Sequence, residues 1–264
     1  MKSETNLAKP IADFLRFFLH IHQLNSIFVF TLARYEKQID AMANAMKVIN
    51  KVSPDKKHET EENFRTRYKE NIDAANKEVS EKFYSVKISE LILLYSRLES
   101  AIEEVVYLYF LKSEYQKMPA IENIKINLID ILSMKKRDQK IQMADIFIQQ
   151  RTLGQKYGFY RFESIIEPIF GKSSIDENIK HSIYLFAQIR NLLVHKNGIV
   201  DKQFKELFKN HRQIIGEKIK IDDQMMESCI SAVVTYASDI IDRIKKKASN
   251  NDFNLTTRSS RAAG

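Results

Sequence analysis

The sequence predicts an all-α protein, and three observations support this fold class. The chain has 264 residues but only 6 Gly and 4 Pro, whereas the turns of a β-sandwich or barrel need many residues of both types. Leu, Ile, Lys, Glu, Gln, Met and Ala together make up just over half of the chain instead, and most of these residues favour helices. Hydrophobic residues make up 44% of the chain, which is enough for a core and excludes wholesale disorder.

Residues 1–83 carry two hydrophobic stripes, which predict an N-terminal helical hairpin. Both stripes repeat at spacings of three and four residues, and a polar segment at residues 50–60 separates them. We expect this hairpin either to pack on the rest of the protein or to form a coiled coil that dimerises or binds a partner. The first stripe is Phe28, Leu32, Tyr35, Ile39, Met42, Met46 and Ile49, and the second is Phe64, Tyr68, Ile72, Ala75, Val79 and Phe83.

The middle of the chain predicts one long helix followed by shorter ones. Two shorter helices are expected near 121–134 and 138–151, and a third at 160–169 ends at Gly171. The long helix spans 88–112, and its inward face comprises Leu91, Leu94, Leu98, Ala101, Ile102, Val105 and Tyr109.

A helix over residues 175–195 follows, with signals at both of its ends. Ser174 is expected to cap its N-terminus, because a serine hydroxyl accepts hydrogen bonds from the first free N–H groups. Asn197 and Gly198 are expected to end it, because both residue types tolerate the left-handed backbone of a helix stop.

Two further helices complete the expected fold. Asp201 caps the first, and the second spans 223–247 and ends in a run of lysines. Residues 248–264 are polar and are expected to form a disordered tail. The only cysteine, Cys229, falls on an apolar stripe and is expected in the core.

The charge and the single cysteine predict a cytoplasmic protein that binds a polyanion. The net charge is +8, and residues 180–220 hold nine Lys/Arg against three Asp/Glu, a net charge of +6. Such a segment suits a polyanion, although basic helices are often only solvated surface. One cysteine cannot form an intrachain disulfide, which fits a reducing compartment. Charged and histidine residues within 11–33 argue against a membrane span there.

One segment carries a recognisable motif: Arg190 and Asn191, then three residues, then His195. With the Gly198 and Asp201 that follow, and flanking helices, this pattern resembles the HEPN domain family over about residues 85–247. The resemblance implies a HEPN-type helical bundle over 84–247, preceded by the hairpin of 1–83. It also implies a homodimer whose composite catalytic site pools Arg190, Asn191 and His195 from two copies.

The chemistry of these residue types suits RNA cleavage without a metal or other cofactor. Histidine can take or give a proton near neutral pH, and arginine can direct two donors at phosphate oxygens. Asn191 could orient the phosphate or the histidine. The resemblance therefore implies a metal-independent endoribonuclease that uses 2′-OH attack, in a toxin–antitoxin or antiphage (abortive infection) system. An antitoxin or regulatory protein would be its partner.

Structural interpretations of the same motif stay open at this point. Arg190 could pair with Glu99 or Glu103 on the neighbouring helix, and His195 could interact with the dipole at the end of its own helix. The alternative function is a non-catalytic HEPN-fold module that binds a protein or RNA.

A basic face next to the motif is the expected RNA track. Lys202, Lys205 and Lys209 recur at three and four residues, so on one helix they would share a face, and Lys196 lies just before them. Lysines of this kind bind backbone phosphates, which gives affinity without sequence preference.

Overall fold

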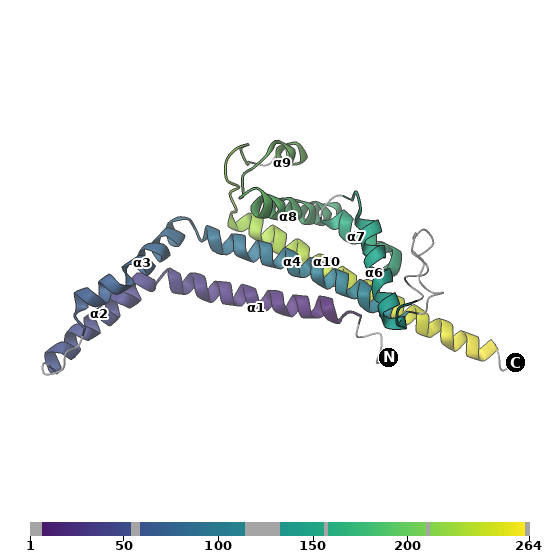
Figure 1. The fold of residues 1–264 in the computed structure, drawn as a ribbon, viewed down its shortest axis with the longest axis horizontal. Helices are drawn as coiled ribbons and strands as arrows, with labels where there is room; N and C mark the ends of the chain where they lie inside the picture. Colours follow the sequence, from purple (N-terminus) through teal and green to yellow (C-terminus); the bar gives the residue numbers. More distant parts are fainter. Residues whose placement is uncertain (1–6, 54–58, 114–132, 156–157, 210–211, 262–264) are drawn as a thin grey trace. The chain divides into compact units, whose positions relative to one another are not determined.

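The computed structural model describes residues 7–53, 59–113, 133–155, 158–209 and 212–261, and the side chains among them up to residue 249. Within these ranges the chain is helical throughout, apart from loops and one isolated antiparallel bridge between Ile199 and Lys218 (Figure 1). The prediction of an all-α fold is confirmed. No helix in the described ranges is long and apolar enough to cross a membrane.

The chain divides into two compact units. One unit is Leu19–Glu90, and the other combines Met1–Phe18 with Leu91–Gly264. Two helices continue from one unit into the other: α1 (Lys9–Leu32) and α4 (Tyr84–Lys112).

The unit Leu19–Glu90 contains the expected hairpin, formed by α2 (Tyr35–Val52) and α3 (Glu61–Ser80), which pack side by side (Figure 1). The Thr60 hydroxyl accepts a hydrogen bond from the Asn63 N–H and so caps α3. Ile39, Ala43 and Phe64 form the buried core of the pair, and Tyr35, Met46, Tyr68 and Ile72 pack around it.

The first hydrophobic stripe does not lie on one continuous helix, contrary to expectation. The chain turns at Ala33 and Arg34, so Phe28 and Leu32 belong to α1 and the rest of the stripe belongs to α2. No Gly or Pro marks this turn. The Arg34 N–H bonds the Thr31 carbonyl, and the Arg34 guanidinium stands 3.9 Å from the centre of the Phe30 ring.

In the other unit, α4 supplies the central apolar surface. All seven residues expected on its inward face are buried, so that prediction is confirmed. Aromatic contacts join α4 to α6 (Lys136–Thr152), α7 (Phe159–Phe170) and α8 (Glu177–His195). The ring pairs are Phe110–Phe147, Tyr95–Phe162 and Tyr95–Phe186.

The last long helix, α10 (Asp223–Arg261), packs against α7 and α8. Cys229 is 2% exposed on its inner face, as expected, and burial raises the pKa of its thiol to about 12. The helix continues beyond Lys247, although the polar composition of residues 248–264 predicts a tail without regular structure. The helix expected near 121–134 lies mostly outside the described residues.

The two ends of α8 differ in how well the sequence predicted them. Ser174 does not cap the helix, because Asp176 accepts the hydrogen bond from the Ile179 N–H, and Ser174 bonds Asp239 of α10 instead. The stop at Asn197 and Gly198 is confirmed. Their φ angles are 51° and 74°, and the Gly198 N–H donates to the Leu192 carbonyl at 2.9 Å.

Gly158 offers a test of how closely α7 and α8 pack. It precedes α7 with φ of 73°, and a Cβ there would lie 3.0 Å from both the Ala187 Cβ and the Ile183 carbonyl oxygen. Gly154 has nearly the same φ, 72°, but its Cβ would meet nothing within 4 Å. Left-handed backbone costs roughly 1–2 kcal/mol at a residue with a side chain. Gly158→Ala should therefore lower the free energy of unfolding in urea by more than Gly154→Ala does. Equal losses would contradict the close packing.

Candidate functional site

The three residues of the motif line one polar cavity of about 410 Å³. The cavity lies among α4, α7 and α8, and Arg190, Asn191 and His195 all come from the last two turns of α8. A single protomer is therefore enough to bring one arginine, one amide and one histidine together. The other lining residues are Tyr95, Glu99, Ser100 and Glu103 of α4 and Arg161 of α7.

The packing of α8 determines which side chains reach this cavity. Ile183, Phe186, Ala187, Ile189 and Leu192 are buried, which fixes the rotation of the helix. Arg190 and Asn191 are consequently half-buried at the edge of the core, while His195 is exposed as the last helical residue.

Arg190 is held by weak contacts rather than by a carboxylate. Its Nη1 donates to Asn191 Oδ1 at 3.4 Å, and its guanidinium carbon stands 5.7 Å from the centre of the Tyr95 ring. Its Nε is buried and has no hydrogen-bond partner. A buried donor without a partner is uncommon in folded proteins and is satisfied when an acceptor binds.

The expected structural alternative, an ion pair between Arg190 and Glu99 or Glu103, is not found among the described residues. Glu99 forms its ion pair with Arg161 instead, and Nη2 of Arg161 lies 3.3 Å from Oε1 of Glu99. Glu103 has a raised pKa, first because it is partly buried and then because Glu99 lies close by. Arg161 thus reduces the negative charge next to Arg190 and leaves the Arg190 guanidinium available to an anion.

Sequence reasoning did not find Arg161. Nothing in the sequence marks it, because a single arginine on a short helix looks like any solvated residue. Only the structure shows that it lines the same cavity as Arg190. The burial of Phe162, Ile165, Ile166 and Ile169 on other faces of α7 leaves Arg161 half-buried beside α4.

The expected basic face is only partly formed. The helix α9 (Lys202–Leu207) ends before Lys209, because Phe208 leaves helical geometry with φ of −125° and ψ of 59°. Lys209 is exposed beyond the helix, so only Lys202 and Lys205 share a helical face. The expectation of a single three-lysine face is therefore wrong.

The basic residues also have acidic neighbours. The ammonium of Lys196 forms an ion pair with the Asp201 carboxylate. Nζ of Lys202 lies 3.8 Å from Oε1 of Glu206. Burial acts to raise the pKa of Asp201, but the hydrogen bonds from Lys196 and from the Phe204 N–H outweigh it, so the pKa stays below its usual value. None of the four lysines lines the cavity that holds Arg190.

The cavity is therefore a polar pocket with a cationic donor, an amide and an accessible imidazole. Within the part of the chain that the structure describes, no three His, Cys, Asp or Glu residues gather closely enough to hold a metal ion. Comparisons with models of protein families, with curated proteins and with solved structures give no match for this chain.

Proposed function

We propose that this protein is a metal-independent endoribonuclease of the HEPN type. It would act in the cytoplasm as a toxin or an antiphage (abortive infection) effector that an antitoxin or regulatory protein controls. The observation that carries the proposal is the cavity lined by Arg190, Asn191 and His195, in which Arg190 Nε is buried without an acceptor. A phosphate oxygen would supply that acceptor.

The proposed reaction needs a base, an acid and a cation around one phosphate. His195 removes the proton of the ribose 2′-OH, the 2′-oxygen forms a bond to phosphorus, and the bond from phosphorus to the 5′-oxygen breaks. The leaving 5′-oxygen takes a proton from a second histidine. Arg190 stabilises the charge that builds up on the phosphate oxygens, and Asn191 orients the phosphate.

The need for a second histidine is the reason to propose a homodimer. One protomer contributes one His195 to the cavity. A two-fold axis next to the exposed end of α8 would add the same three residues from a second copy, and two-fold symmetric dimers are the commonest oligomers.

The chemistry of the products tests this proposal directly. The full chain, incubated with RNA in EDTA, should yield fragments that end in a 2′,3′-cyclic phosphate and begin with a 5′-OH. Enzymatic end-labelling with and without phosphatase treatment distinguishes these ends. Fragments that begin with a 5′-phosphate would overturn the mechanism. RNA binding without any cleavage would favour the alternative, a non-catalytic RNA-binding module.

The lysines near α9 are expected to contribute affinity rather than cleavage specificity. Changing Lys202, Lys205 and Lys209 to Gln should reduce the slope of log affinity against log salt, by on the order of 0.7 for each single-strand phosphate that is no longer neutralised. The positions of the cuts should not change. Lys245 and Lys246, which are exposed on α10, provide a matched pair of control substitutions. An unchanged slope in the triple variant would show that this surface is not the RNA track.

A further inference from the structure

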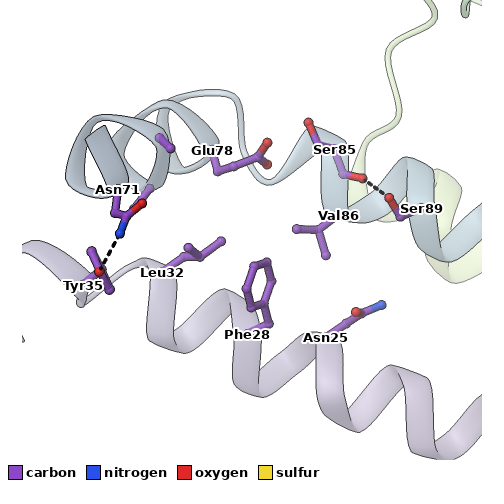
Figure 2. A pocket seen from close by; sticks show the side chains of 11 residues that line it. Asn25, Phe28, Leu32, Tyr35, Asn71, Glu78, Ser85, Val86 and Ser89 are labelled. Carbon is purple, nitrogen blue, oxygen red and sulfur yellow. Dashed lines mark hydrogen bonds between the residues drawn. The ribbon is translucent and has the colours of Figure 1, made fainter. Parts of the chain in front are cut away.

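A second cavity lies within the unit Leu19–Glu90 and shares no residue with the site described above. Its volume is about 530 Å³, which is in the range of cavities that hold small organic ligands. Figure 2 shows Phe28 and Leu32 of α1 below the carboxylate of Glu78 from α3, with Val86 of α4 beside them. The remaining lining residues are Asn25, Tyr35, Asn71, Ala74, Ala75, Ser85 and Ser89.

Three polar side chains of this cavity have hydrogen-bond partners within the protein. Asn71 donates to the Tyr35 hydroxyl at 3.5 Å, and the Ser89 hydroxyl donates to the Ser85 carbonyl at 2.9 Å (Figure 2). Glu78 is different, because its Oε2 is buried and has no hydrogen-bond partner. Leaving a buried acceptor without a donor is unfavourable, and more so when the acceptor carries charge.

The backbone that follows Glu78 forms a tight turn beside the cavity. The turn between α3 and α4 places both Lys82 and Phe83 in the left-handed region, with φ of 54° and 58°. The Phe83 N–H donates to the Glu78 carbonyl at 2.7 Å and ties the end of α3 to the start of α4. The turn therefore fixes the backbone at the end of α3, from which Glu78 reaches the cavity.

We propose that this cavity binds a small organic cation with an aromatic or aliphatic body and a primary ammonium group. The ammonium would donate to Glu78 Oε2, and the body would pack on Leu32, Val86 and the ring of Phe28, which is 51% exposed. An exposed aromatic ring near an acidic group suits a cation in a further way, since the ring face attracts positive charge. An anionic ligand would meet the uncompensated Glu78 and is disfavoured.

The absence of tryptophan from the chain makes an indole probe selective. The full chain is titrated with tryptamine, which carries an ammonium, and with tryptophol, which has the same ring system but a neutral hydroxyl. Fluorescence anisotropy of the indole measures binding. Tryptamine should bind about tenfold more tightly than tryptophol, or better, because its ammonium adds an ion pair with the Glu78 carboxylate that a neutral hydroxyl cannot form.

Three variants locate the binding. Glu78→Gln should abolish the preference for tryptamine, while Glu70→Gln, an exposed carboxylate of the same helix, should preserve it. Ala74→Phe should fill the cavity and weaken the binding of both probes, and helicity measured by circular dichroism controls for folding. Equal affinity for the two probes in the unaltered chain would overturn the proposal. So would a preference for tryptamine that survives Glu78→Gln, or a failure of both probes to bind.

Discussion

The His195→Ala variant is expected to lose RNA cleavage by a factor of about 10² to 10⁴, the usual contribution of a general acid or base. Among the described residues, His195 is the only histidine that lines the cavity, and it is exposed at the end of α8, so its removal should not disturb the core. His181 lies on the same helix against the Phe208 ring and provides the matched control. His181→Ala should cleave RNA at the rate of the unaltered chain. Equal rates for both variants and the unaltered chain would refute the assignment of His195.

Arg190→Ala is expected to be as inactive as His195→Ala, because both residues act on the same phosphate. The double variant should therefore lose little more than either single variant. Arg190→Lys should recover only part of the activity, since an ammonium lacks the planar fork of a guanidinium. Full activity in Arg190→Lys would indicate that the charge alone is needed.

Mixing His195→Ala with the unaltered chain tests the proposed dimer. A mixed dimer keeps only one of the two histidines that the proposed reaction needs, so cleavage should fall by more than dilution of the unaltered chain alone would cause. A protein that cleaves RNA at full specific activity as a monomer would overturn the composite site. Sedimentation or light scattering on the same samples gives the oligomeric state.

The largest expected loss of stability comes from a buried ion cluster between α7 and α10. Arg243 Nη1 and Nη2 donate to the Glu163 carboxylate at 3.1 and 2.7 Å, and Nη1 also donates to the Gly171 carbonyl at 2.7 Å. Arg243 Nε lies 3.0 Å from Asp239 Oδ2, a charge contact without hydrogen-bond geometry. The Tyr236 hydroxyl donates to Glu163 at 2.8 Å.

Arg243→Met should lower the free energy of unfolding by about 3–5 kcal/mol, because it leaves Glu163 buried without its cation. Thermal or urea unfolding measures this loss, and Lys245→Ala is the control. Lys245 forms an exposed pair with Asp242 at 3.8 Å, which should contribute about 1 kcal/mol or less. Combining Glu163→Met with Arg243→Met should cost less than the sum of the two single changes. If the double variant lost as much free energy of unfolding as the two single variants together, the two charges would not stabilise each other.

The sequence predicted those elements whose signal is a repeated or local pattern. The buried face of α4 follows from helical periodicity, and the stop after His195 follows from the backbone freedom of Asn197 and Gly198. The placement of Arg190, Asn191 and His195 at the end of one helix follows from the same stop, because all three residues come just before it. These predictions depend only on residues close together in the chain.

The sequence could not predict features that depend on distant partners. Ser174 and Asp176 are both good caps, and the choice between them follows from Asp239, which binds Ser174 from 65 residues away. Glu99 is a plausible partner for Arg190 in the sequence, but Arg161 competes for it, and that competition depends on how α7 packs. The turn at Ala33 and Arg34 contains no Gly or Pro, and the apolar stripe continues across it. The sequence pattern therefore predicts an uninterrupted helix at this point.

The burial of Cys229 has a practical consequence for studies of this protein in solution. The only thiol of the chain is 2% exposed, and its pKa of about 12 leaves almost none of it as the reactive thiolate at neutral pH. The folded protein should therefore resist alkylating reagents, and the rate at which Cys229 is modified reports how often α10 opens. A cysteine introduced at any exposed position would then be labelled selectively. Fluorophores or spin labels can be attached to an otherwise unaltered chain without first removing a native thiol.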